Sequence, residues 1–191
     1  MKKAAVGLGI LAVVLLVVFG GSFVSRRNEM VTLKENIKGA WAQVDTVIQR
    51  RADLIPNLVN TVKGYAAHEQ KVLEDLSNAR AQLAGARNPS ERIAANTQLE
   101  GALSRLLVVV ENYPNLKADQ QFLRLQDELA GTENRIAVER RRYNGAVQTY
   151  NTTIQTFPNS LVASISGFQR EDAYIKAEGA AREVPKVDFS K

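Results

Sequence analysis

The sequence predicts an all-α protein, in which an N-terminal transmembrane helix precedes an antiparallel four-helix bundle of long helices. Residues 4–24 form an uncharged apolar run. Beyond them, apolar residues recur at steps of three and four, the period of an amphipathic helix. Between Glu29 and Phe157, no apolar-polar alternation is long enough to predict a strand. We therefore expect three parts: an anchor (1–25), a helical bundle (26–168) and an extended or disordered tail (169–191).

The apolar run is long enough to cross a bilayer as a helix. It holds 13 Leu, Ile, Val and Phe residues between Lys2-Lys3 and Arg26-Arg27. As a helix it would measure roughly 31 Å, close to the thickness of the hydrocarbon core. We predict an uncleaved single-pass anchor. The alternative is a cleaved signal peptide, since Gly20 and Ser22 could satisfy the small-residue cleavage rule.

The flanking charges leave the orientation of this anchor open. Arg26, Arg27, Lys34 and Lys38 follow the run, and the positive-inside rule would place that side in the cytoplasm. A two-lysine leader before an apolar stretch is also typical of export signals.

The first bundle helix is predicted over about residues 28–52 and the second over about 54–83. Asp53 could cap the second helix, with Pro56 in its first turn, where a missing N–H costs nothing. The rival is one continuous helix kinked at Pro56. We expect a break or a sharp kink there.

The third helix has the clearest start signal. Asn88 can be its N-cap, Pro89 its first residue and Glu91 the capping-box partner, and the helix should end before Pro114. The fourth helix, over about 116–156, carries large residues at every seventh position: Phe122, Leu129, Ile136, Tyr143, Tyr150 and Phe157. Such spacing is typical of lengthwise packing in a left-handed bundle. A short helix could follow over residues 159–168.

The C-terminal residues allow two interpretations. Val184, Val187 and Phe189 alternate around Pro185, so the tail is either disordered or an extended segment that lies in a groove. In the second case it would clasp a neighbouring subunit.

The sequence offers little for catalysis, and we predict no enzymatic activity, cofactor or metal. The one histidine, His68, has Val72 where a zinc-binding helix needs a second histidine. One histidine also cannot supply the two Glu-x-x-His motifs of a di-iron bundle. Cysteine is absent, and there is neither a P-loop nor a Gly-x-Ser-x-Gly turn. All 20 acidic residues and 23 of the 25 basic ones follow residue 24, so the remainder carries only +3, and we expect no nucleic-acid partner.

Two polar patterns look unlike ordinary bundle surface. Tyr143-Asn144 and Tyr150-Asn151 are a pair repeated one heptad apart, and a buried Asn or Tyr must find a partner, so these pairs should fix helix register. The other pattern, Asp53 to Leu58, combines Asp, Pro and Asn. Arg50 and Arg51 point in different directions, so only one of them can face a neighbouring element.

Three stretches resemble the LemA family of bacterial membrane-anchored helical proteins: AWAQVDTVIQRRADLIPNLVNTVKGYAAHE from Ala40, ENYPNLKADQQFLRLQDELAGTENRIA from Glu111 and YNGAVQTYNTTIQTFP from Tyr143. The resemblance implies a membrane segment and an antiparallel helical bundle. The residues that carry the family pattern are Trp41, Asp45, Arg50, Arg51, Asp53, Pro56, Asn57, Tyr113, Pro114, Phe122, Tyr143, Asn144, Tyr150, Asn151, Phe157 and Pro158.

The resemblance implies a membrane role without an established enzymatic activity. Similar proteins are associated with membrane-embedded zinc metallopeptidases, and one relative takes part in building magnetosome membranes. Some similar proteins carry a lipobox cysteine where this chain has Gly20-Gly21. The resemblance therefore implies a bacterial inner-membrane protein with an extracytoplasmic domain. The positive charges after the apolar run predict the opposite orientation.

We expect a membrane scaffold that self-associates through its bundle and organises a membrane or envelope assembly. The alternative is a non-catalytic adaptor or regulator of a membrane-embedded metallopeptidase. The expected partners are the lipid bilayer, further copies of the chain, and a metallopeptidase or another envelope protein.

Overall fold

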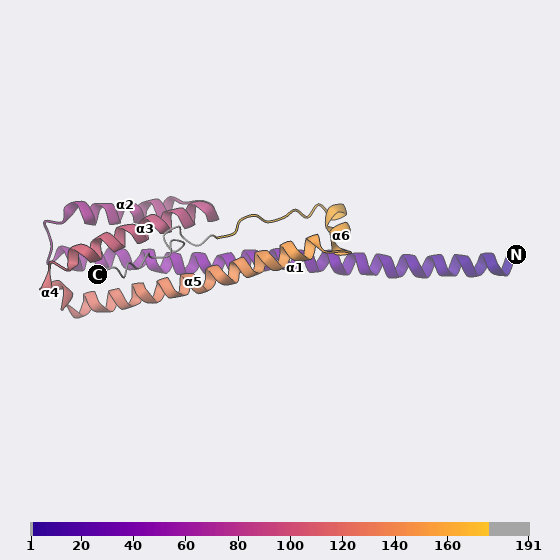
Figure 1. Cartoon of the computed structure of the whole chain (residues 1–191), viewed down its shortest axis with the longest axis horizontal. Coiled ribbons are helices and arrows are strands. Elements are labelled where there is room, and N and C mark those ends of the chain that lie inside the picture. The colour runs from indigo at the N-terminus through magenta and orange to yellow at the C-terminus, as the bar shows by residue number, and fades with distance from the viewer. Residues whose placement is uncertain (1, 176–191) are drawn as a thin grey trace, which may run out of the picture.

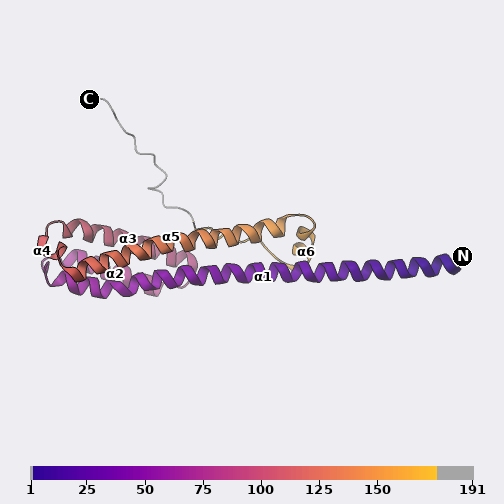
Figure 2. The same ribbon diagram turned by 90° about the horizontal axis from the view of Figure 1, so that it is seen from below.

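The computed structural model describes residues 2–175, with side chains described from residue 7 onward. Every regular element in this part of the chain is a helix, so the expected all-α class is confirmed. Figures 1 and 2 show an elongated molecule with one long helix along its whole length.

Helix α1 (Lys2–Lys63) is a single helix of 62 residues. Its apolar part extends beyond the other helices (Figure 1), and the side chains of residues 7–22 are exposed. This part is long and apolar enough to cross a membrane. From Met30 onward, α1 buries a stripe of apolar residues against the other helices. The predicted anchor and the first helix of the domain are therefore one element.

The predicted break at Pro56 is wrong. Helix α1 continues through Pro56 to Lys63, and α2 begins only at Gln70. Asp53 caps no helix, and its exposed carboxylate accepts a hydrogen bond from Gln49 Nε2 at 2.9 Å. The missing N–H of Pro56 leaves the carbonyl of Ala52, four residues earlier, without its helical donor. Arg80 Nε, from α2, donates to this oxygen at 3.0 Å, so a distant side chain satisfies the group that Pro56 orphans.

Helices α2 (Gln70–Gly85) and α3 (Pro89–Val110) form an antiparallel pair joined by a short turn. The predicted start of α3 is confirmed: Asn88 Oδ1 accepts from the Glu91 N–H at 2.9 Å and Pro89 is the first helical residue. The Glu91 carboxylate accepts from the N–H of Arg87 at 2.8 Å, one residue before the N-cap.

A short helix, α4 (Pro114–Lys117), leads into α5 (Gln120–Gln155). Asp119 caps α5 by accepting from the Phe122 N–H at 2.8 Å. The short helix expected after it is confirmed as α6 (Asn159–Ser166). Gly167 ends α6 with φ at 73°, a left-handed conformation that glycine adopts without steric cost.

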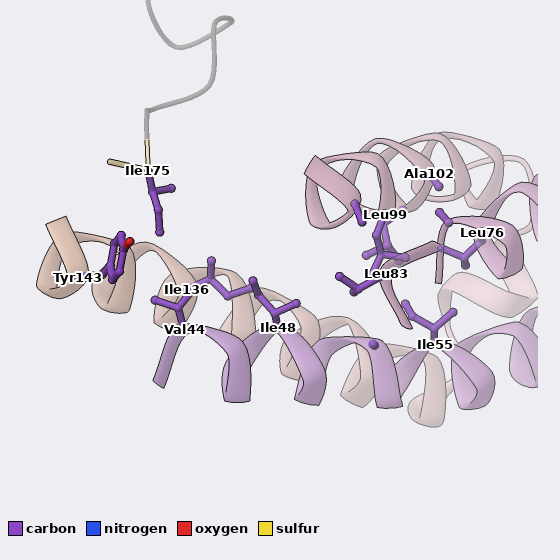
Figure 3. Packing of buried hydrophobic residues seen from close by; sticks show 14 of the residues in the cluster. Val44, Ile48, Ile55, Leu76, Leu83, Leu99, Ala102, Ile136, Tyr143 and Ile175 are labelled. Carbon is purple, nitrogen blue, oxygen red and sulfur yellow. The ribbon is translucent and has the colours of Figure 1, made fainter. Parts of the chain in front are cut away.

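The expected antiparallel four-helix bundle is matched only in part. Helices α1 and α5 pack along nearly the whole of α5, and the α2–α3 pair lies against the half of α1 remote from the N-terminus (Figures 1 and 2). Helix α2 has 16 residues and α3 has 22, too few to cover the 36 residues of α5. One apolar cluster joins the two pairs, with Ile55, Leu76, Leu83 and Leu99 at their junction (Figure 3).

The seven-residue pattern predicted for α5 holds over most of the helix. Phe122, Ile136, Tyr143 and Tyr150 are buried, and Leu129 is half-buried. The expected burial of Phe157 is wrong, because its side chain is 86% exposed. Helix α5 ends at Gln155, so Phe157 lies in the turn that follows, where the helical period no longer sets its direction.

Candidate functional site

The repeated Tyr-Asn pairs of α5 hold the segment that follows α6. The Asn151 side chain makes two hydrogen bonds to the backbone of Glu171: Oδ1 accepts from N–H at 2.9 Å and Nδ2 donates to C=O at 2.7 Å. Asn144 makes the same two hydrogen bonds to the backbone of Ile175: Oδ1 accepts from N–H at 2.9 Å and Nδ2 donates to C=O at 2.8 Å. We call Asn144 and Asn151 the asparagine clamp.

The spacing of the asparagine clamp fits an extended peptide. One heptad of helix is about 10.5 Å long. The four steps from Glu171 to Ile175 span at most about 14 Å when fully extended. A side-chain amide carries both a donor and an acceptor, so it pairs with a backbone unit as a neighbouring strand would. Residues 169–175 therefore run antiparallel to α5 and are held through their backbone.

The two tyrosines complete this contact. Tyr150 Oη donates to the Gln169 carbonyl at 2.9 Å, and the Tyr143 ring meets Trp41 edge-on with centroids 5.8 Å apart. Burial, and then the negative charge of Glu171, raise the pKa of both Tyr143 and Tyr150. Figure 3 shows Ile175 pointing toward α5 near Tyr143, where it is buried.

The sequence analysis expected the Tyr-Asn pairs to find partners and so to fix helix register. Instead, Asn144, Tyr150 and Asn151 bond to the segment after α6. The Tyr143 ring contacts a long helix, at Trp41 of α1. The segment 169–175 has no helical or strand periodicity, so only the unusual pairs themselves signalled a bound peptide. The tail residues Val184, Pro185, Val187 and Phe189 lie outside the described residues.

A buried arginine links three helices next to this segment. Arg51 of α1 is 3% exposed, and its guanidinium pairs with the Glu133 carboxylate of α5. Its Nη1 also donates to Asn96 Oδ1 of α3 at 3.4 Å. The neighbouring Arg50 is exposed, so Arg51 is the member of the pair that faces the interior. A buried charge of this kind favours one arrangement of its helices.

Glu133 also lines a groove between α3 and α5 that ends at the asparagine clamp. The residues that line it are Glu100, Glu133, Ala137, Arg140, Arg141, Asn144 and Ile175. Charged side chains of both signs dominate this groove. It carries no nucleophile held by a base.

A second arginine that the sequence analysis missed joins α3 to α1 and α2. Arg92 Nε donates to Asp45 Oδ1 at 2.6 Å, while its Nη1 donates to the Leu83 carbonyl at 3.0 Å. The role of Asp45 is therefore to position α3. Nothing in the local sequence around Arg92 reveals a partner 47 residues away.

Two tyrosine–carboxylate pairs hold the turns at the far end of the domain. Tyr113 Oη donates to Glu69 Oε1 at 2.8 Å, and Tyr65 Oη donates to Asp119 Oδ2 at 2.9 Å. These hydrogen bonds raise the pKa of each tyrosine. The Phe122 N–H and then the Tyr65 hydroxyl lower the pKa of Asp119.

The remaining family-pattern residues are not gathered at one place. Pro56 and Asn57 are exposed on α1, Pro114 begins α4, and Pro158 is the N-cap residue of α6. Within residues 7–175, no group of three or more His, Cys, Asp and Glu could hold a metal ion. His68 is exposed. The arrangement described here holds helices and a peptide segment together.

Comparison with known proteins adds a family and several relatives. The model of the LemA family matches residues 40–189. Magnetosome protein MamQ 2 of Paramagnetospirillum magneticum is 28% identical, over 86% of this chain and 70% of the relative. Magnetosome protein MamQ of Magnetospirillum gryphiswaldense is 27% identical, with the same coverage. Protein LemA of Metamycoplasma hominis is 26% identical, over 87% of this chain and 74% of the relative.

Proposed function

Because this chain belongs to the LemA family, we propose that it is a non-enzymatic, membrane-anchored scaffold that self-associates and organises a membrane or envelope assembly. The observation that carries this proposal is the continuity of α1, which joins the apolar anchor to the core of the domain as one helix of 62 residues. The domain is thus a stiff extension of its anchor.

A domain that extends rigidly from its membrane anchor, which we call the post, is suited to forming assemblies. Residues 26–63 of α1 would hold the far end of the domain about 57 Å from the bilayer surface, at about 1.5 Å per residue. Anchoring copies in one plane raises their local concentration and gives them a common orientation, so weak lateral contacts suffice for assembly. Relatives that are named as magnetosome proteins agree with a role at a membrane.

The side of the post nearest the anchor is available for lateral contacts. There α1 and α5 pack on each other and on α6, the segment 169–175 lies along α5, and Val31 stays 41% exposed on α1. We place the contact between copies on this side. The tail residues Val184, Pro185, Val187 and Phe189 would act as the clasp that reaches the next subunit.

A second function, an adaptor for a membrane metallopeptidase or another envelope protein, is favoured by a different observation. Several apolar residues near the end of the domain remote from the anchor are exposed: Tyr65, Leu107, Val108 and Leu123. Apolar side chains at the tip of a post suit a partner that approaches from above the membrane.

We place the anchor in a bacterial inner membrane and the domain on its extracytoplasmic side, following the lipobox-bearing relatives. The arginines after the anchor favour the opposite side. Protease added to intact spheroplasts should digest the domain, and digestion only after lysis would reverse this orientation.

Native mass spectrometry of the full-length protein released from detergent tests the scaffold. We expect oligomers that become fewer when the chain is truncated after Ile175, since this removes the clasp but keeps the clamped segment. Monomers at every concentration would contradict the scaffold and favour the adaptor.

A further inference from the structure

Helix α6 and the turn before it expose three large apolar side chains. Phe157 is 86%, Leu161 59% and Ile165 67% exposed. Leu161 and Ile165 are four residues apart, so they share one side of α6. Val162 and Ala163 are buried and attach the helix to the domain. A short helix that is apolar on its free side as well as on its packed side marks an interaction surface.

The position of α6 along α1 identifies what this surface meets. Arg26 Nη1 donates to Asn159 Oδ1 at 2.5 Å, which fixes the start of α6 beside α1 two residues after the apolar run ends at Val24. Helix α6 also packs on both α1 and α5. In Figure 1 it lies across these two helices, at the end of the domain nearest the apolar part of α1.

The geometry points to a bilayer surface as the occupant. If α1 crosses the membrane along its own axis, a helix that lies across α1 at this level is parallel to the bilayer plane. An interfacial helix of this kind buries an apolar side at the boundary between headgroups and acyl chains, with basic residues beside it. Arg26 and the exposed Arg27 provide the basic residues at the same level.

We infer that α6 is a second, interfacial membrane contact, in which Phe157, Leu161 and Ile165 enter the bilayer that α1 spans. This inference rests on the anchor in the proposed function. The two contacts together would set the depth and the tilt of the domain, because a single spanning helix alone leaves both adjustable. The competing occupant of this face is a second copy of the chain.

Single-cysteine labelling tests the contact, because the chain has no cysteine of its own. Full-length protein with Leu161→Cys or Ile165→Cys carries an environment-sensitive fluorophore in phosphatidylcholine vesicles with a minor anionic lipid. Both positions are exposed, so neither substitution removes a contact with the core. Val108→Cys is the matched control, an exposed apolar residue near the end of α3 remote from α6, and Leu16→Cys reports on the anchor.

We expect brominated acyl chains to quench the label strongly at residue 16 and clearly at 161 and 165, with little effect at 108. If the label is quenched at residue 16, but no more at 161 and 165 than at the control position 108, the inference is overturned. The anchor would remain supported in that case. Absence of quenching at 16 would overturn the anchor as well. A blue-shifted label at 161 that escapes bromine and reverts when the protein is diluted with excess lipid would assign this face to a second copy instead.

Discussion

At the scale of single residues, the asparagine clamp gives two side chains a role that helix packing alone would not require. Asn144 and Asn151 each pair with the backbone of one residue in the segment 169–175, so these four hydrogen bonds do not depend on the side chains of the segment. The nearby Tyr150 contributes one further bond, to Gln169.

Replacing Asn151 by alanine should release this segment. The substitution removes both hydrogen bonds to Glu171, each worth about 0.5–1.5 kcal/mol, so the free energy of unfolding should fall by roughly 1–3 kcal/mol. Hydrogen exchange at the Glu171 amide should accelerate. Gln148→Ala, an exposed change on the same helix, is the control, and equal effects of the two variants would refute the clamp.

The two buried tyrosines should make the fold sensitive to alkali. Their pKa values are raised above the usual 10.0, so the folded state retains protons that the unfolded state loses. The free energy of unfolding therefore keeps its full value below about pH 10, and it falls as the pH rises toward the pKa values of the folded state.

Urea unfolding of wild type and of the Tyr143→Phe, Tyr150→Phe double variant at increasing pH measures this effect. The variant should start less stable, because it lacks the Tyr150 hydrogen bond, and should lose less stability above pH 10. If wild type and the double variant lost stability equally with rising pH, Tyr143 and Tyr150 would not be the source of the alkali sensitivity.

At the scale of elements, the continuity of α1 depends on a contact between helices. Pro56 orphans the Ala52 carbonyl, and Arg80 of α2 supplies the missing donor. The helix can therefore continue through Pro56, because the Ala52 carbonyl that loses its helical donor there is already hydrogen-bonded.

A double-mutant cycle tests this compensation. Arg80→Met keeps an apolar stem but removes the donor, and should lower the free energy of unfolding by about 1–3 kcal/mol. In a Pro56→Ala background the helical N–H returns, so most of that cost should disappear. The same cost in both backgrounds would show that Arg80 acts through another contact. Pro56 is exposed, so its replacement leaves no cavity.

The contrast between α3 and α1 shows what sequence patterns can predict. The start of α3 was predictable because its cap lies within four residues, from Asn88 to Glu91. The continuation of the helix through Pro56 was not predictable, because the donor to the Ala52 carbonyl, Arg80, lies 28 residues from Ala52 in sequence.

Of the other differences, one has the same cause and one has a local cause. The segment 169–175 has no period of its own, and the site that binds it is built from α5. Phe157 was misplaced because the seven-residue pattern was extended past the end of the helix. Local signals thus predicted most of the helices, the cap of α3 and the long apolar part of α1, while contacts between distant residues decided the packing.

At the scale of the whole molecule, α1 dictates the shape. It carries the apolar run, the interior-facing Arg51 and the orphaned carbonyl of Ala52 in one helix, and every other long helix is arranged along it (Figure 1). If α1 crosses a membrane as we propose, its continuity predicts that the domain has no hinge at the membrane surface and that its far end keeps a fixed height.

The distance between spin labels on either side of the membrane boundary tests this claim most directly. Val17→Cys and Gln43→Cys are both exposed positions of α1, 26 residues apart, and a continuous helix separates them by about 39 Å. Double electron–electron resonance on full-length protein in nanodiscs, diluted with unlabelled protein, should give one narrow distribution near that distance. A broad or distinctly shorter distribution would show a hinge between anchor and domain, and would contradict the post on which the proposed scaffold depends.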